Sequence, residues 1–130
     1  MVRTAARFLL AAFMTVMGVA HFVVPDPFVR IVPAMLPAPA FLVYLTGLWE
    51  IAGGLGLLWP RTRRLATWAL IALFVVVFPA NINMAVRNIQ FPGHEIPNWM
   101  LWARLPWQLG LIAWALWVGR PAGPTPAHAV

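Results

Sequence analysis

The chain has 130 residues, of which 62% are hydrophobic and only 9% are charged. A soluble domain carries charge on about a quarter of its residues, so this composition argues against a soluble protein and predicts an integral membrane protein. The formal net charge is +6, but the nine basic residues are all arginines that lie mostly at the ends of apolar runs, not in a nucleic-acid-binding stripe. Cysteine is absent, which excludes disulfides and thiolate metal sites.

Four apolar runs are each long enough to cross the hydrocarbon layer of a bilayer, which is roughly 30 Å thick. They comprise residues 5–24, 41–59, 65–85 and 99–119. Backbone amides must be paired in lipid, so each run is expected to be a helix. The first run also has the form of a signal peptide, but retaining it completes an even-numbered bundle. We therefore predict one domain, residues 1–120, that is an all-α bundle of four transmembrane helices.

The connection between the first two runs is rich in proline but also carries apolar side chains. Phe28, Ile31 and Val32 have helical spacing, and Asp26 precedes them in the position of an N-terminal cap. This pattern predicts a short amphipathic segment that lies on the outer bilayer surface across the mouth of the bundle.

Glu50 lies in the second run and is the only carboxylate within any of the four runs. A lone acid in a membrane is energetically unfavourable, so we expect it to have both a partner and a function. Gly47 and Gly54 are three and four residues away on the same helix face, which allows a neighbouring helix to approach the carboxylate closely. Glu50 is therefore expected to point into the bundle.

Residues 60–64 join the second and third runs and contain three arginines. Loops rich in arginine stay in the cytoplasm, so this turn and both chain termini are predicted to be cytoplasmic. The expected location is the cytoplasmic (plasma, or inner) membrane, as a multi-pass protein. The tail, residues 121–130, is rich in Pro, Ala and Gly and is predicted to be disordered.

Alternating helix directions bring the remaining polar residues of the runs to the outer half of the bundle, above Glu50. These candidate ligand-binding residues are His21, Asn81, Asn83, Arg104 and Gln108. Asn81 and Asn83 lie about 200° apart around their helix, so one of the two is expected to face the cavity, and the pattern does not say which. Pro79 is expected to kink the third helix there. His94 and Glu95 are adjacent in the second outer loop, but adjacency is weak evidence for a metal site, and none is predicted.

Four segments resemble the DoxX-like family of small four-helix membrane proteins. They are GVAHFVVPDPFVRIVPAMLP (residues 18–37), TGLWEIAGGLGLLWPRTRRLA (46–66), FPANINMA (78–85) and RLPWQLGLIAWALW (104–117). The matching positions are His21, Pro25, Pro33, Pro37, Glu50, Pro60, Arg64, Pro79, Asn81, Arg104, Pro106 and Gln108. The family is named after a subunit of a membrane thiosulfate:quinone oxidoreductase, so the resemblance implies a four-helix bundle and a redox-linked role by fold-level analogy.

A transport or ion-coupling role is disfavoured, because the inner half of the bundle offers no polar path. Three other readings stay open. The favoured one is a quinone-binding subunit of a redox-linked membrane system, in which Arg104, Gln108 or His21 bonds the quinone carbonyls and a redox partner protein supplies electrons. The second is a stand-alone enzyme on a lipophilic substrate, with Glu50 as the catalytic general acid or base. The third is a structural protein in which Glu50 and Arg104 form a buried ion pair. The sequence encodes no cofactor of its own, the bilayer is the expected partner, and homo-oligomerisation is left open.

Overall fold

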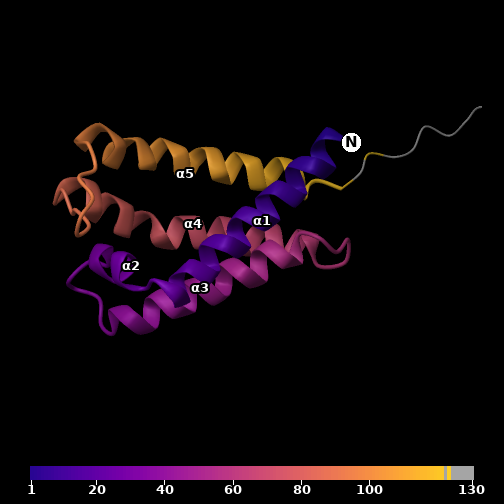
Figure 1. Cartoon of the computed structure of the whole chain (residues 1–130). Coiled ribbons are helices and arrows are strands. Elements are labelled where there is room, and N and C mark those ends of the chain that lie inside the picture. The colour runs from indigo at the N-terminus through magenta and orange to yellow at the C-terminus, as the bar shows by residue number, and fades with distance from the viewer. Residues whose placement is uncertain (122, 124–130) are drawn as a thin grey trace, which may run out of the picture.

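The structure, a computed structural model, describes residues 1–121 and 123. This part of the chain is all-helical and contains no strand. Its five helices are α1 (Val2–Val23), α2 (Asp26–Ile31), α3 (Pro39–Gly56), α4 (Arg63–Val86) and α5 (Asn98–Gly119). Figure 1 shows the four long helices packed lengthwise, with α2 and the α4–α5 connection at one end, here called the α2 end. The N-terminus and the α3–α4 connection lie at the opposite end, here called the turn end. Apart from Pro121 and Gly123, the predicted disordered tail falls outside the described residues.

The α3–α4 connection differs from the prediction, because α3 ends at Gly56 and Arg63 already begins α4. The side chains that follow α3 satisfy carbonyls that its last turn leaves without helical partners. Thr62 Oγ1 donates to the Gly56 carbonyl at 2.8 Å, and Arg63 Nε donates to the Leu57 carbonyl at 3.2 Å. The arginine-rich segment therefore closes one helix while it opens the next.

The predicted short helix after the first run is present as α2, but the predicted role of Asp26 is wrong. Asp26 is the first residue of α2, Pro25 takes the cap position, and no side-chain cap bond is made. Proline is favoured in the first turn because its ring fixes a helical φ and it has no N–H that needs a partner. Pro25 and Pro27 therefore set the start of α2 without a capping side chain.

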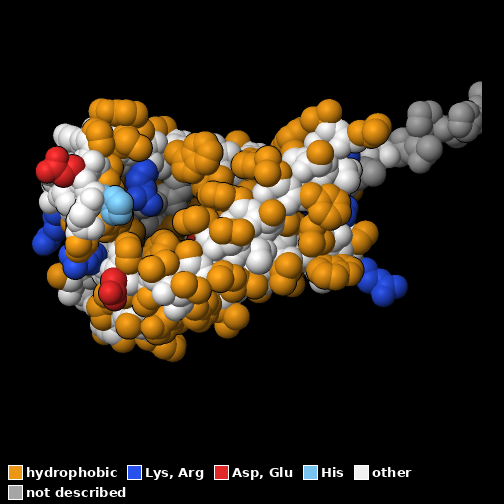
Figure 2. Space-filling view, viewed as in Figure 1, with side chains coloured by type: hydrophobic (Ala, Val, Ile, Leu, Met, Phe, Trp, Pro, Cys, Tyr) orange, Lys and Arg blue, Asp and Glu red, His pale blue; other side chains and the backbone are white. Residues whose placement is uncertain are grey.

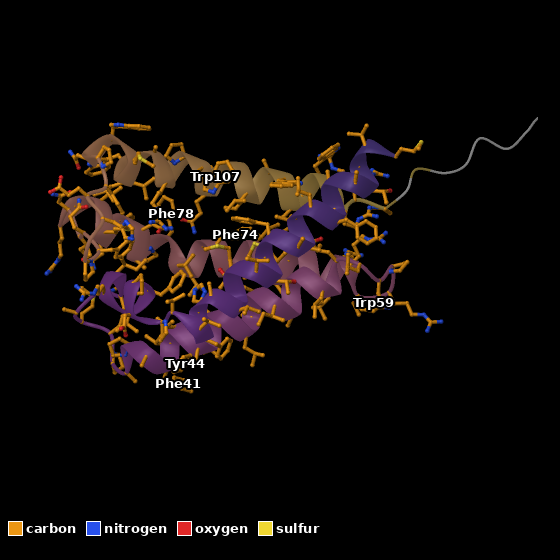
Figure 3. All side chains as sticks on the ribbon, in the orientation of Figure 1. Phe41, Tyr44, Trp59, Phe74, Phe78 and Trp107 are labelled. Carbon is orange, nitrogen blue, oxygen red and sulfur yellow. The ribbon has the colours of Figure 1, made fainter. Side chains whose placement is uncertain are left out.

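Two helices, α1 and α4, are long and apolar enough to cross a membrane. The most apolar windows of α1 and α4 are only 33% and 28% buried, whereas the core helix of a soluble protein is mostly buried. Figure 2 shows hydrophobic side chains over the flanks of the bundle and charged ones mainly at its ends. In Figure 3, Phe41 and Tyr44 of α3 point away from the bundle, and Trp59 lies at the turn end.

Helices α1 and α3 approach each other closely at glycines. A Cβ atom on Gly18 would lie 2.6 Å from the Gly47 carbonyl oxygen, and one on Gly54 would lie 2.9 Å from the Ala11 carbonyl oxygen. Both distances are too short for a side chain, so this contact requires glycine. Gly47 and Gly54 face α1 as their spacing around Glu50 predicts, and α1 is therefore the helix that approaches the acid.

Helices α1 and α5 meet at the turn end and diverge toward the α2 end (Figure 1). At the turn end, the buried Arg7 donates from Nε to the Val118 carbonyl at 3.0 Å, and Trp114 Nε1 donates to the Ala6 carbonyl at 3.2 Å. The main apolar core fills the same region and includes Leu10, Met14, Leu57, Leu70, Leu73, Phe74, Leu111, Ala115 and Val118. The divergence of α1 from α5 leaves space toward the α2 end.

Candidate functional site

A cavity of about 900 Å³ occupies the space between the helices toward the α2 end. Small-molecule sites typically measure about 300–1,000 Å³, so this volume suits a ligand of substantial size. All five helices line it. Its apolar wall includes Phe13, Met17, Phe28, Ile31, Val43, Phe74, Val77, Trp99, Trp107 and Leu111, and its polar residues are His21, Thr46, Glu50, Asn81, Arg104 and Gln108. Figure 2 shows this face of the molecule hollowed between α1 and α5.

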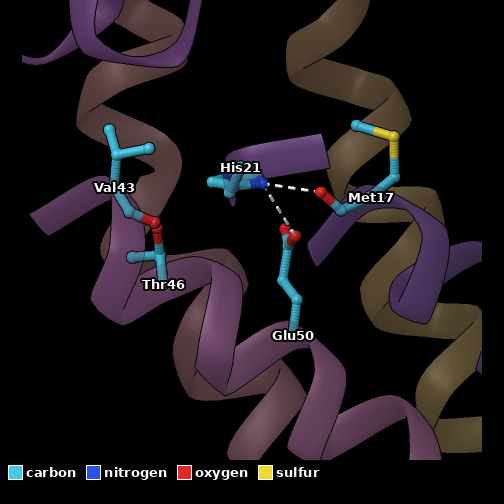
Figure 4. Close-up of polar contacts among 5 residues, drawn as sticks. All are labelled: Met17, His21, Val43, Thr46 and Glu50. Carbon is cyan, nitrogen blue, oxygen red and sulfur yellow. Dashed lines mark hydrogen bonds and ion pairs between the residues drawn. The ribbon is translucent and has the colours of Figure 1, made fainter. Parts of the chain in front are cut away.

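Glu50 and His21 form the first polar pair of the cavity, and they come from adjacent helices. His21 Nδ1 lies 3.3 Å from Glu50 Oε2, and the two side chains are 9% and 13% exposed (Figure 4). Gly18 and Gly47 bring the two helix backbones together beside this pair, since a Cβ on Gly47 would lie 2.6 Å from His21 Cβ. The glycine contact therefore positions the imidazole against the carboxylate.

The proton on His21 Nδ1 is directed mainly at a backbone carbonyl. Nδ1 lies 2.7 Å from the carbonyl oxygen of Met17, and a carbonyl can only accept, so Nδ1 must carry a hydrogen. Glu50 Oε2 is buried and has no hydrogen bond of good geometry. The two groups are therefore close enough to interact electrostatically, but they do not form a well-aligned hydrogen bond. The His21 ring also stacks on the ring of Phe28, and the two ring centroids lie 3.8 Å apart.

Asn81 and Gln108 form the second polar pair of the cavity and join α4 to α5. Asn81 Nδ2 donates to Gln108 Oε1 at 2.7 Å, and Gln108 Nε2 donates to the Phe74 carbonyl at 2.7 Å. Pro79 lies within α4 beside this network and lacks the N–H that would bond the Val75 carbonyl. The network thus braces α4 in the region where proline interrupts its hydrogen bonding.

The structure resolves which of the two α4 asparagines faces the cavity. Asn81 lines it, whereas Asn83 lines a separate depression of about 310 Å³ and is not among the residues of the large cavity. Asn83 Nδ2 donates to the Ile31 carbonyl at 3.0 Å. Its place on α4 therefore makes it an anchor for α2.

Arg104 lines the cavity but does not form the expected ion pair with Glu50. Its Nη1 lies 3.1 Å from Met84 Sδ, and within 4 Å Glu50 pairs with His21 instead. The physical reason is helix adjacency, because the glycines place α3 against α1 while α5 packs on α4. Both side chains thus line the cavity without forming an ion pair with each other.

Several lining residues were not singled out from the sequence. Thr46 lines the cavity one helical turn before Glu50, and its Oγ1 donates to the Val43 carbonyl at 3.0 Å. Its spacing of four from Glu50 is the signal that could have identified it. Trp99 and Trp107 also line the cavity, although tryptophans near the ends of membrane-spanning helices are more often membrane anchors. Within residues 1–121 and 123, no group of three or more metal-ligating side chains is found.

The match to known proteins covers the entire cavity. A family model described as a domain of unknown function, DUF8561, matches residues 10–119, a range that contains every residue lining the cavity. The comparisons found no match among curated proteins and none among solved structures. The resemblance to DoxX-like proteins stays a prediction.

Proposed function

We propose that this chain, which belongs to the DUF8561 family, is a membrane protein that binds a lipophilic small molecule with a polar head, of the quinone class. The observation that carries the proposal is the cavity of about 900 Å³, whose wall is largely apolar and whose few polar groups come from four helices. Ligand sites have this composition because apolar walls supply affinity and a few fixed polar groups supply orientation.

The proposed setting is the cytoplasmic membrane, crossed four times by α1, α3, α4 and α5, with both termini in the cytoplasm. Arg61, Arg63 and Arg64 support this orientation, because positive charges favour the cytoplasmic side and all three lie at the turn end. The cavity then lies in the outer half of the membrane, within reach of molecules dissolved in the bilayer.

The cavity offers defined positions for a quinone-like head. Arg104 can donate to an oxygen of the head, while Glu50 and Asn81 lie on other walls of the same space. A bound quinone supplies two-electron redox chemistry, and the electrons come from a partner protein in this proposal. The chain's own contribution is to bind and orient the head and to keep water away from it. The DoxX-like resemblance favours the same redox-linked role.

A second candidate is a stand-alone enzyme with Glu50 as general acid or base. The observation that favours it is the carboxyl group, which makes no hydrogen bond to the described residues and lines the cavity beside His21. A carboxyl free of structural bonds is able to exchange a proton with a bound substrate. The third reading requires an ion pair between Glu50 and Arg104, but in the structure Glu50 lies against His21 and Arg104 against Met84.

The test is mass spectrometry of the gently purified native protein and of two variants, Arg104→Ala and Glu50→Gln. We expect a co-purified lipophilic molecule in the native protein that is lost or strongly reduced in Arg104→Ala. Arg87→Ala is the matched control, because Arg87 is an exposed arginine at the end of α4 outside the cavity. A folded native protein that carries no small molecule, and takes up none from a lipid extract, would contradict the proposal.

A further inference from the structure

The orientation of the Gln108 side-chain amide follows from its backbone partner. The Phe74 carbonyl can only accept, so the atom 2.7 Å from it must be Nε2, which makes Oε1 the atom that faces Asn81. Gln108 is 3% exposed, so its amide has almost no surface left for a ligand. A residue expected to donate to a quinone carbonyl is therefore occupied by the protein itself.

The same chain of bonds fixes the amide of Asn81. Because Gln108 Oε1 accepts, the Asn81 atom that approaches it must be Nδ2. The remaining polar atom of this side chain is Oδ1, to which the described residues donate no hydrogen bond, and Asn81 lines the cavity. Asn81 therefore offers the cavity a hydrogen-bond acceptor.

Glu50 presents a carboxyl oxygen to the cavity. Its Oε2 is buried against His21. Its Oε1 also receives no hydrogen bond from a described residue, but this oxygen is not fully buried. Oε1 thus has accessible surface on the cavity side. This carboxyl group can accept a hydrogen bond from a ligand when it is ionised, and it can donate one when it is protonated.

Two of the three donors expected for quinone carbonyls are occupied by the protein. His21 Nδ1–H is directed to Met17, and Gln108 Nε2 is directed to Phe74. Of the three donors expected for quinone carbonyls, Arg104 retains guanidinium N–H groups that no described residue accepts. The hydrogen bonds therefore leave Asn81 Oδ1 as a free acceptor in the cavity, beside the remaining N–H groups of Arg104 and the indole N–H groups of Trp99 and Trp107.

From this free acceptor we infer that the cavity selects a ligand whose polar head donates hydrogen bonds, as the hydroxyl groups of a hydroquinone do, over the same head in its carbonyl form. The inference rests on the proposed function and specifies which form of the ligand is bound. A hydroxyl seated at Asn81 donates to its Oδ1, which a carbonyl would leave unpaired, and the hydroxyl oxygen can still accept from Arg104. The free-energy cost of leaving a buried acceptor unpaired is similar in size to the contribution of a whole hydrogen bond.

The experiment compares three probes that share one tail. They are decyl-ubiquinone, its hydroquinone, and the dimethyl ether of that hydroquinone, which keeps the oxygens but lacks hydroxyl hydrogens and cannot be oxidised to the quinone under these conditions. Binding to the full chain in lipid nanodiscs is followed under argon by tryptophan fluorescence, since Trp99 and Trp107 line the cavity. The chain has no cysteine, so the reductant that maintains the hydroquinone has no protein thiol or disulfide to alter.

We expect the hydroquinone to bind about tenfold more tightly than either other probe, which corresponds to roughly one hydrogen bond. Asn81→Leu should reduce this preference to about threefold or less while the quinone still binds. Asn98→Leu is the matched control, because it makes the same change at an exposed residue at the start of α5 that does not line the cavity, and it should keep the preference.

The outcomes separate this inference from the proposed function. Equal or tighter binding of the quinone or of the dimethyl ether would overturn the preference for a donating head and leave the proposed function in place. If none of the three probes binds to the folded protein, the quinone-class function itself fails. The comparison on the unmodified chain decides the question even where Asn81→Leu does not fold.

Discussion

At Gly47, the separation of α3 from α1 leaves no room for a side chain. An added Cβ would lie 2.6 Å from His21 Cβ and 3.0 Å from the Gly18 carbonyl oxygen, so the two helices would have to move apart. That movement would also shift His21 relative to Glu50, which packs one turn along the same face. A single residue thus controls both packing and the geometry of the polar pair.

We expect Gly47→Ala to lower the free energy of unfolding by about 1–3 kcal/mol, the usual effect of overpacking a close contact. Gly110→Ala is the control, because a Cβ at Gly110 would meet nothing within 4 Å and alanine favours a helix over glycine. Unfolding followed in detergent measures both changes. Equal destabilisation by the two variants would show that close approach at Gly47 is not required.

The His21–Glu50 pair predicts energetic coupling between two helices. Replacing His21 with leucine removes the group nearest the buried Glu50 Oε2, so we expect destabilisation of about 1–3 kcal/mol. In a Glu50→Gln background the same replacement should have a smaller effect, with a coupling energy above about 0.5 kcal/mol in a double-mutant cycle. Strictly additive effects would mean that the proximity of the two groups carries no energy.

Helix α2 has only six residues and is held by its side chains and one backbone carbonyl. Phe28 stacks on His21, Ile31 is buried, and the Ile31 carbonyl accepts from Asn83. An isolated helix of this length is not stable in water, so these contacts hold it in place. Because Phe28 and Ile31 also line the cavity, α2 covers one end of it.

We expect Phe28→Ala to release a bound hydroquinone probe about threefold to tenfold faster, because the stacked ring both covers the cavity and holds His21. Val29→Ala makes a similar truncation on the same helix at a residue that does not line the cavity, and it should leave the dissociation rate unchanged. Stopped-flow displacement of the probe gives both rates. The role assigned to α2 fails if Phe28→Ala dissociates at the native rate.

At the scale of the whole molecule, the two ends of the bundle differ in charge and in the connections they carry. The absence of cysteine allows single cysteines to report on sidedness. Arg61 lies in the α3–α4 connection and Glu95 in the α4–α5 connection, and both residues are exposed. We expect a membrane-impermeant maleimide to label Glu95→Cys in intact cells and Arg61→Cys only after permeabilisation. Labelling of both positions from the same side would contradict the four-span topology.

The sequence predicts the long helices well because a lipid-exposed backbone must be helical, and it predicts that Glu50 points inward from its flanking glycines. The contacts between residues of different helices were harder to predict from the sequence. The choice between Asn81 and Asn83 depends on the rotation of α4, which packing sets. The Glu50–Arg104 pair was wrong because opposite charge alone does not identify which helices are neighbours. The glycine of α1 that decides this, Gly18, carries no charge and gives no such signal.

The polar pairs divide the bundle into two halves. His21 and Glu50 join α1 to α3, whereas Asn81 and Gln108 join α4 to α5. Each polar pair thus lies within one half, and the cavity lies between the two halves. Between the halves, hydrogen bonds from Arg7 and Trp114 fasten the turn end.

At the α2 end, the side-chain hydrogen bond between the halves is the one from Asn83 to Ile31. The two halves are therefore joined by the side-chain hydrogen bonds from Arg7 and Trp114 at the turn end and by the one from Asn83 at the α2 end. A ligand that reached both Glu50 and Asn81 would add a polar link between the halves inside the cavity.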